Sequence, residues 1–271
     1  WPRRRGLFTK ENLFISTWPM PLLRRSCKEL EMDKLKELQD VIDHSQNIVF
    51  FGGAGVSTES GIPDFRSADG IYHQSYKYSP EQVVSHSFFI QHTEAFYEFY
   101  KEKMMMLDAK PNAAHRKLAE LEMAGKLKAV VTQNIDGLHQ AAGSKTVYEL
   151  HGSIMRNYCM DCHEFYDAEY VKNSDGIPRC KKCGGIIKPD VVLYEEGLDS
   201  ATIQGAVNAI SQADMLIIGG TSLVVYPAAG FIDYFNGKYL AVINKSETGR
   251  AVRSNLTISA PIGEVMEKIF V

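Results

Sequence analysis

Short runs of apolar, mostly β-branched or aromatic residues recur along the chain, and each run ends in a cluster of glycine or polar residues. Runs that stay apolar throughout, without alternation, are typical of strands covered on both faces, as in a parallel sheet. We therefore expect these runs to form such a sheet. They lie at residues 47–55, 128–136, 146–152, 214–222 and 239–245, with a weaker one at 256–261.

Helical patterns separate the runs. Residues 33–44, 112–125, 200–213 and 262–270 carry apolar positions three or four apart, which places them on one helical face. Strands that alternate with helices predict an α/β fold with an open, doubly wound parallel sheet.

In a sheet of this kind the ligand binds outside the carboxyl ends of the strands. Residues capable of binding a ligand follow several of the predicted strands, so we expect a functional site at that edge. They are Gly53, Gln133, Asn134, Asp136, His151, Thr221, Ser222 and Asn244.

Two stretches interrupt the alternation of strands and helices. Residues 70–110 are rich in Tyr, Phe and Met and indicate a helical insertion, whose aromatic residues we expect to form core or lid packing instead of a cofactor site. Residues 153–187 contain two cysteine pairs and indicate a second small insertion. The sheet-forming part then comprises residues 32–69, 111–152 and 188–271.

The composition limits the classes of function. The 271 residues are 45% hydrophobic, enough for the core of one large domain, and the net charge of −3 does not indicate binding to nucleic acid or membranes. No apolar run is long enough to span a membrane. We expect a cytoplasmic protein without a specific nucleic-acid partner.

Residues 1–31 show no helical or strand period, and a helical pattern begins just after Met32. Two explanations remain open for this segment. Lys28-Glu29 can be encoded by a ribosome-binding sequence, so residues 1–31 are either an untranslated leader before a natural start at Met32 or a disordered tail.

A glycine cluster, Gly53-Ala54-Gly55, follows the first predicted strand and is expected to open a helix. Glycines there let backbone N–H groups approach a diphosphate, and a helix N-terminus stabilises its charge. Thr58 occupies the third glycine position of a dinucleotide fingerprint, and no acidic residue follows at the expected distance. The loop therefore favours a nucleotide site, but not the site of an ordinary dehydrogenase. The alternative to a nucleotide site is a simple strand–turn–helix corner.

The cysteines form two Cys-x-x-Cys pairs separated by 17 residues, a spacing typical of a structural tetrahedral zinc site without an open position. A haem-attachment pattern in residues 159–163 and redox catalysis by one pair are less favoured, and His163 is expected to be a neighbour and not a ligand. The predicted ligands are Cys159, Cys162, Cys180 and Cys183.

The polar residues Gln133, Asn134 and Asp136 surround the apolar Ile135. They favour either a helix N-cap or a binding site. His151 stands at a strand end level with this cluster, which favours a general base over a structural histidine.

Taken together, these motifs resemble those of the sirtuins, the NAD-dependent protein deacylases, and most closely the bacterial type. The segments GAGVSTESGIPDFR, TQNID, HG, the two cysteine pairs, KPDVVLYEE and GGTSLVVYPAA stand in sirtuin order, and the resemblance covers residues 32–271. It implies a Rossmann-like sheet with an inserted zinc-ribbon and helical domain, NAD as co-substrate and one structural zinc ion.

The resemblance also implies roles for individual residues. His151 is the implied general base, Asn134 and Gln133 position the ribose and a water, and Asp136 with Ile135 holds the nicotinamide carboxamide. The remaining implied NAD contacts are Gly53, Ala54, Gly55, Thr58, Asp64, Phe65 and Arg66, with Gly220, Thr221, Ser222, Asn244 and Ile262 at the adenosine half.

By the same resemblance, an acyl-lysine peptide enters as an added strand between residues 191–196 and 223–227, and Val192 and Tyr194 line the lysine tunnel. Buried sheet is the alternative for both segments. Where the family has Phe-Gly-Glu, this chain has Tyr194-Glu195-Glu196, which leaves the geometry of that edge open.

Desuccinylating relatives carry a Tyr-x-x-Arg pair that binds the acyl carboxylate. Here Tyr97 is present, but Tyr100 occupies the arginine position, so neutral acyl groups are expected as substrates. Two alternatives to a deacetylase remain. One is an NAD-dependent mono-ADP-ribosyltransferase. The other, from a different class, is a zinc-ribbon module that binds nucleotide without turnover.

Overall fold

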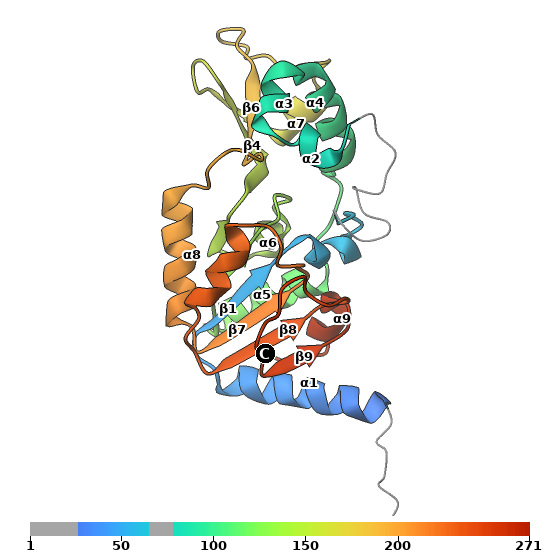
Figure 1. Cartoon of the computed structure of the whole chain (residues 1–271), viewed down its shortest axis with the longest axis vertical. Helices are drawn as coiled ribbons and strands as arrows, with labels where there is room; N and C mark the ends of the chain where they lie inside the picture. Colours follow the sequence, from blue (N-terminus) through green and yellow to red (C-terminus); the bar gives the residue numbers. More distant parts are fainter. Residues whose placement is uncertain (1–26, 65–77) are drawn as a thin grey trace, which may run out of the picture.

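A parallel sheet of six strands, in the order β3-β2-β1-β7-β8-β9, forms the centre of the fold (Figure 1). The computed structural model describes residues 27–64 and 78–271. Every neighbouring pair in this sheet is parallel, so the predicted doubly wound sheet is confirmed. The strands are β1 (Ile48–Gly52), β2 (Leu127–Thr132), β3 (Val147–Glu149), β7 (Met215–Gly219), β8 (Tyr239–Ile243) and β9 (Leu256–Ile258).

The central strands bury both of their faces. In β1, Ile48 and Phe50 contribute to one core and Val49 and Phe51 to another, and all four side chains are fully buried. Because successive side chains of a strand point to opposite faces, a strand covered on both sides needs apolar residues at every position. This explains why the runs are continuous.

Helices supply the two covering layers. On one face of the sheet lie α1 (Cys27–His44), α5 (Ala113–Met123) and α9 (Ile262–Met266), whose apolar residues share one core with five of the strands. On the other face lie α8 (Ser200–Gln212) and the 3₁₀ segment η5 (Ala228–Tyr234). Figure 1 shows α8 and α1 along two borders of the sheet.

Helix α1 begins at Cys27 and is therefore longer at its N-terminal end than the predicted helical range 33–44. Residues 29–31 are strong helix formers without glycine or proline, which lets the helix extend beyond its packed part. Leu30 and Met32 are about half exposed, whereas Leu38 and Ile42 are fully buried against the sheet. The packing pattern therefore marks the buried part of the helix and not its first residue.

The two predicted insertions pack together into one second lobe, in the upper part of Figure 1. Aromatic residues of the helical segment, such as Phe96 and Tyr97, share one core with Ile154, Val171 and Ile187 of the cysteine-containing segment. The aromatic stretch thus forms core packing, as expected. The lobe contains α2 (Pro80–Val83), α3 (His86–Gln91), α4 (Thr93–Phe99), the π-helical η4 (Tyr100–Met104), α7 (Ala168–Asn173) and an antiparallel sheet of β5 (Phe165–Asp167), β4 (Gly152–Cys159) and β6 (Ile187–Val191).

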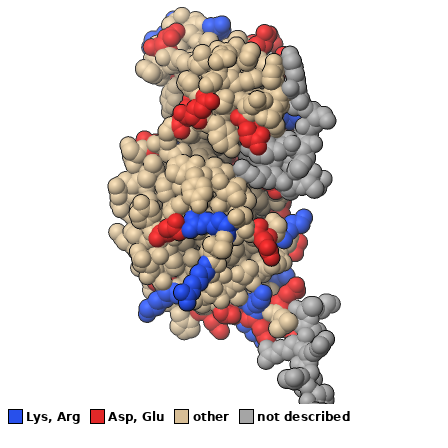
Figure 2. All heavy atoms as spheres, viewed as in Figure 1, with Lys and Arg blue, Asp and Glu red and all other residues tan. Residues whose placement is uncertain are grey.

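Among the described residues, no helix is both long and apolar enough to cross a membrane. On the face in Figure 2, the Lys and Arg side chains of the described residues are interspersed with Asp and Glu instead of forming one basic patch.

Two histidines are buried together behind the sheet. The rings of His115 in α5 and His139 in α6 (Leu138–Ala142) lie 4.7 Å apart between centroids. Among the described residues, His115 Nε2 and both ring nitrogens of His139 have no hydrogen-bond partner. Burial lowers the pKa of His115 to about 4 and lowers the pKa of His139 well below its usual value.

This pair predicts an acid-sensitive core. Because the unfolded state binds protons near pH 6.5 and the folded state does not, stability falls as pH decreases from about 6.5 toward 4. For His115 alone the loss between pH 7 and pH 5 is about 2 kcal/mol. We expect the loss measured by urea unfolding of zinc-loaded protein to shrink in His139→Leu. If the unfolding free energy of His139→Leu depends on pH as strongly as that of the wild-type protein, other groups cause the acid sensitivity.

Candidate active site

The loops after β1 and β7 touch through their backbones. The strand order reverses direction at this pair, so their ends form the switch point where ligands bind in such sheets. The N–H of Gly55 donates to the carbonyl of Gly220 at 2.8 Å. A Cβ on Gly55 would lie 2.8 Å from that oxygen, and a Cβ on Gly220 would lie 2.3 Å from the Val56 nitrogen. Both positions therefore require glycine.

The chain does not form an α-helix after Gly53-Ala54-Gly55, so the expectation that this cluster opens one is wrong. The chain forms two short 3₁₀ turns, η1 (Ala54–Val56) and η2 (Thr58–Ser60), and Gly61 ends the second with a φ of 84°. Hydrogen bonds to residues outside the loop hold it in this conformation. The Gly55 N–H donates to the Gly220 carbonyl, and the Val56 carbonyl accepts from Asn112 Nδ2 at 2.7 Å. The backbone N–H groups from Gly55 to Ser57 are therefore bonded to carbonyls of Gly220, Gly53 and Ala54.

A buried hydroxyl joins the glycine loop to the polar cluster after β2. Ser57 Oγ donates to Asp136 Oδ2 at 2.6 Å and accepts from Asn134 Nδ2 at 3.0 Å. Ser57 is 1% exposed, and Asn134 is also buried. This residue was missed in the sequence analysis, although its hydroxyl lies inside the glycine-loop motif. Only the fold brings positions 57 and 136 together.

The carboxyl group of Asp136 is held in a partly apolar environment. Burial raises its pKa, while the hydrogen bonds from Ser57 and from the Leu138 N–H, 2.9 Å from Oδ1, act in the opposite direction. The N-cap of α6 is Gly137, so Asp136 lies one residue before the cap position and bonds the N–H of the first helical residue. Its Oδ2 faces the glycine loop, so Asp136 has a role in the site as well.

Gln133, Thr221 and Asn244 form a second polar cluster across the ends of β2, β7 and β8. Gln133 Nε2 donates to Thr221 Oγ1 at 3.0 Å. The backbone of Thr221 exchanges two hydrogen bonds with the side-chain amide of Asn244, at 3.0 and 2.6 Å. These contacts fix the loop after β7 in the conformation that meets Gly55.

The remaining residues predicted for the adenosine half lie close by but differ in exposure. Ser222 is half-buried, and its carbonyl accepts from the Gly249 N–H at 2.8 Å. Ile262 is buried in the core beside Gly219, where it packs at the base of the loop.

The other residues predicted to bind NAD lie in or after the glycine loop. Thr58 is exposed, Ala54 and Asp64 are half-buried, and Phe65 and Arg66 lie outside the described residues.

His151 is oriented by the backbone of the neighbouring strand end. Its Nδ1 lies 3.0 Å from the Gln133 carbonyl, which can only accept, so in the neutral ring Nδ1 carries the proton and Nε2 is the basic nitrogen. Burial lowers the pKa of His151, although the bond to Gln133 acts against this change. The imidazole is therefore neutral and able to accept a proton near pH 7.

The same histidine is tied to the second lobe. The Val192 N–H donates to the His151 carbonyl at 3.0 Å. Gly152, with a φ of 72°, leads into β4 so close to β6 that a Cβ would lie 1.9 Å from the Asp190 carbonyl oxygen. The chain therefore passes from the catalytic edge of the sheet into the second lobe through a turn that only glycine fits.

The residues predicted to bind the peptide do not form buried sheet. Val192 to Glu196 follow the end of β6, and residues 223–227 form no strand. Tyr194 is 40% exposed, and Val224 in the second segment is 41% exposed. The buried-sheet alternative is therefore wrong for 223–227.

Tyr97 lies in the core of the second lobe. It is 1% exposed, and its hydroxyl donates to the carbonyl of Ile187. Tyr100 is fully buried, and its hydroxyl has no hydrogen-bond partner among the described residues. Lys101, whose ammonium lies 5.8 Å from the centroid of the Tyr97 ring, is bonded to the carbonyls of Ser174 and Gly176.

The four cysteines converge between β4 and β6, and their sulfur atoms all lie within 4.8 Å of one another. Neighbouring sulfurs are 3.4 to 3.6 Å apart, too far for a disulfide and close to the roughly 3.8 Å expected for thiolates around tetrahedral zinc. The donors fit one zinc ion with no open position, and such a site contributes on the order of 10 kcal/mol to folding. His163 contributes no ligand to this cluster.

Comparisons with known proteins agree on one family. The model of the Sir2 family matches residues 53–227. The NAD-dependent protein deacetylase of Clostridium acetobutylicum is 63% identical over 89% of this chain and 99% of its own length, and that of Clostridium perfringens is 61% identical over 88% and 98%.

Two solved structures give the same result. A Sir2 variant with a deacetylated p53 peptide and 3′-O-acetyl-ADP-ribose is 41% identical, with a TM-score of 0.80 over 87% of this chain and 96% of that one. Sir2 with a p53 peptide and NAD⁺ is 41% identical, with a TM-score of 0.76 over the same shares.

The network around Ser57 predicts a pH-dependent effect of its removal. In Ser57→Ala, Asp136 loses a donor and Asn134 an acceptor, so we expect a loss of about 1–3 kcal/mol in unfolding free energy at pH 7. A raised carboxyl pKa weakens the folded state as pH rises, so the loss should be smaller at pH 4.5. Urea unfolding at both pH values measures this, with the exposed Thr58→Ala as control. Equal losses at both pH values would contradict the link to Asp136.

Proposed function

Because the chain belongs to the Sir2 family, we propose that it is an NAD-dependent protein deacetylase. The observation that carries the proposal is the buried network of Ser57, Asn134 and Asp136, placed beside His151 at the switch point of the sheet.

The residues present fit NAD as co-substrate. The glycine loop would bring its backbone beside the diphosphate at the end of β1, in the way that dinucleotide loops do. Thr221, Ser222 and Asn244 would hold the adenosine half, at an edge whose conformation Asn244 already fixes. Phe65 and Arg66 are proposed on the resemblance alone.

Asp136 would hold the nicotinamide carboxamide. Ser57 and the Leu138 N–H bind its carboxylate from two sides and so set the direction of the remaining lone pairs. The Ile135 carbonyl accepts from the Ile154 N–H at 2.9 Å, so the backbone beside Asp136 is fixed as well. A rigid site of this kind would orient the bond between nicotinamide and the ribose for cleavage.

His151 would act as general base. In the reaction proposed here, the acyl oxygen of acyl-lysine bonds to C1′ of the ribose as the bond to nicotinamide breaks. His151 Nε2 then accepts the proton of a ribose hydroxyl, which attacks the acyl carbon, and water completes the release of free lysine and O-acetyl-ADP-ribose. Asn134 and Gln133 would position the ribose and this water.

The proposed partner is an acylated lysine in a protein. Val192 would line the lysine tunnel, since its N–H is bonded to the His151 carbonyl and the two residues are therefore adjacent. Tyr194 is exposed beside it, while Tyr97 would act from the core by shaping the far end of the tunnel. Backbone pairing at this edge would select little sequence.

Zinc would be structural, held by Cys159, Cys162, Cys180 and Cys183 as thiolates. Paired cysteines that bind a metal as thiolates instead of forming disulfides are typical of a reducing compartment, which supports the proposal of a cytoplasmic protein.

One experiment tests the activity. Incubation with NAD and an acetyl-lysine peptide, followed by mass spectrometry, should give free lysine peptide, nicotinamide and O-acetyl-ADP-ribose. His151→Ala should lower turnover by about 10²–10⁴-fold with an unchanged thermal midpoint, because it removes a positioned general base. ADP-ribose attached to protein would instead indicate an ADP-ribosyltransferase, and unchanged NAD a binding module.

The buried surroundings of Tyr97 and Tyr100 predict the acyl preference. No described cation is free at this position to pair with an acyl carboxylate, since Lys101 is engaged by carbonyls, and an unpaired buried carboxylate is unfavourable. We expect kcat/KM for a succinyl-lysine peptide to be at least about tenfold lower than for the matched acetyl-lysine peptide, as a penalty of 1.4 kcal/mol or more implies. Comparable values for the two peptides would contradict the prediction.

A further inference from the structure

Glu195 has a backbone conformation that side chains rarely adopt. Its φ is 76°, in the left-handed region where glycine is at ease and other residues are disfavoured. It follows Tyr194 in the segment after β6, three residues beyond Val192, whose N–H is bonded to the His151 carbonyl. A non-glycine residue held in this conformation needs contacts that determine it.

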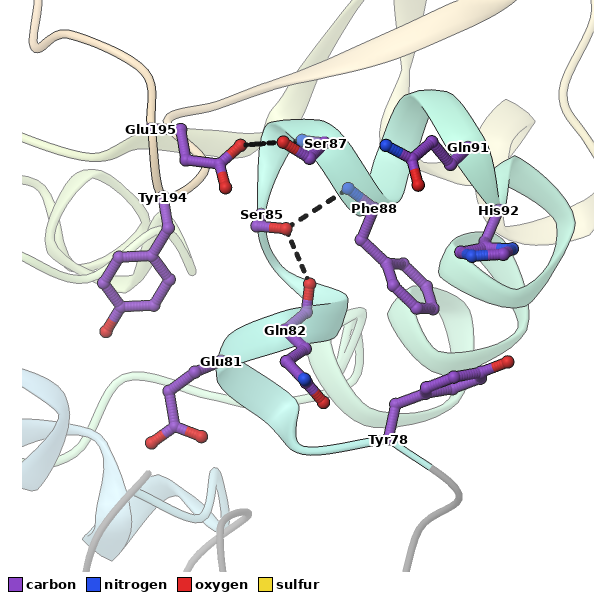
Figure 3. Close-up of a pocket in the computed structure, with 10 residues that line it drawn as sticks. All are labelled: Tyr78, Glu81, Gln82, Ser85, Ser87, Phe88, Gln91, His92, Tyr194 and Glu195. Carbon is purple, nitrogen blue, oxygen red and sulfur yellow. Dashed lines mark hydrogen bonds between the residues drawn. The ribbon is translucent and has the colours of Figure 1, made fainter.

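The side chain of Glu195 supplies such contacts. Its Oε2 accepts from the backbone N–H of Ser87 at 2.8 Å and from the Ser87 hydroxyl at 2.5 Å (Figure 3). Ser87 lies in the first turn of α3, whose N-cap is Ser85. These bonds lower the pKa of Glu195, so its carboxylate is charged when it binds.

Neighbouring residues attach the same segment to the second lobe. The Tyr194 N–H donates to the Val84 carbonyl at 2.9 Å, and the Tyr194 carbonyl accepts from the His86 N–H at 3.0 Å. Glu196 adds a contact to His86 Nδ1 at 2.8 Å. Residues 192–196 are therefore bonded on one side to the start of α3.

On the other side the segment is bonded to the catalytic edge. The Val192 N–H donates to the His151 carbonyl. Glu196 Oε2 accepts from the Leu193 N–H at 2.9 Å and from Lys188 Nζ at 3.1 Å, which closes the turn between them. The anchor at Glu195 thus connects α3, through four consecutive residues, to the backbone of His151.

The anchor also forms one wall of a cavity of about 590 Å³ between α2, α3 and this segment (Figure 3). Tyr194, Glu195 and Ser87 line it together with residues of the second lobe. Without the Glu195 carboxylate, this wall would keep only the bonds of Tyr194 and Glu196 to Val84 and His86, and the side-chain bond to the first turn of α3 would be lost.

We propose that Glu195 is a positioning residue for the acyl-lysine substrate, which holds the edge of residues 192–195 in one conformation by binding Ser87 at the start of α3. The proposal rests on the proposed function, which places the substrate at Val192 and Tyr194. Glu195 acts through the segment that it fixes, and it does not contact the reacting atoms.

The test compares Glu195→Gly with the wild-type protein. Glycine accepts the backbone conformation, so the fold is retained while the anchor is lost. We expect KM for an acetyl-lysine peptide to rise about tenfold, as loss of a hydrogen bond to a charged group implies, with kcat and KM for NAD within about twofold of wild type. Glu195→Gln keeps one acceptor oxygen and should raise KM less.

Two further variants make the test specific. Ser87→Ala should raise KM for the peptide, and adding it to Glu195→Gly should raise KM no further, since the partner is already absent. Glu98→Gln, an exposed carboxylate on α4, serves as the control and should leave KM unchanged.

An unchanged KM for the peptide in Glu195→Gly would overturn the proposal, and so would equal losses in peptide and NAD parameters. A wild-type protein that does not deacetylate the peptide would refute the proposed function instead. In that case the anchor is tested by hydrogen exchange of residues 192–196, where faster exchange in Glu195→Gly supports it and unchanged exchange contradicts it.

Discussion

The backbone contact between Gly55 and Gly220 sets the geometry of the site. Because the sheet reverses its strand order between β1 and β7, the loops that leave these strands run side by side and must approach closely. With any side chain at either position the loops would separate. Ser57 would then lose its place beside Asp136, and Thr221 would lose its place beside Gln133. Each of the two polar clusters includes one residue from these loops, so one contact positions both.

The position of His151 depends on two other hydrogen bonds, one to the sheet and one to the segment after β6. Its ring is held by the Gln133 carbonyl, at the sheet, and its own carbonyl is held by the Val192 N–H, at the start of residues 192–196. The histidine therefore lies on the path between the sheet and the second lobe. If the second lobe moved, Gly152 and Val192 would transmit the movement to His151 before the glycine loop was affected.

Much of this arrangement could be predicted from the sequence, because it depends on local patterns. The continuous apolar runs gave the parallel sheet and its carboxyl edge, and the spacing of Cys159, Cys162, Cys180 and Cys183 gave the zinc site. These features depend on strand periodicity and on ligand spacing, which neighbouring residues in the chain determine.

The features that sequence patterns did not predict depend on contacts between distant residues. Nothing near Ser57 indicates that it will lie beside Asp136, and the glycine loop forms 3₁₀ turns because Gly220 and Asn112 capture its backbone groups. The two insertions form one core because Phe96 and Tyr97 meet Ile154 and Ile187 across the lobe. None of these pairings leaves a periodic signal.

The second lobe combines two kinds of stabilisation, and each needs the other. Four thiolates can fix the ends of β4 and β6, but they cannot position α3, which lies outside the cysteine-containing segment. The aromatic core can position α3 against β4 and β6, but its contacts are non-directional and permit sliding. Directional bonds from Tyr194, Glu195 and Glu196 to residues 84–87 remove that freedom at the edge nearest His151. Residues 192–196 are therefore held by hydrogen bonds to residues 84–87, whose own place is fixed by the aromatic core.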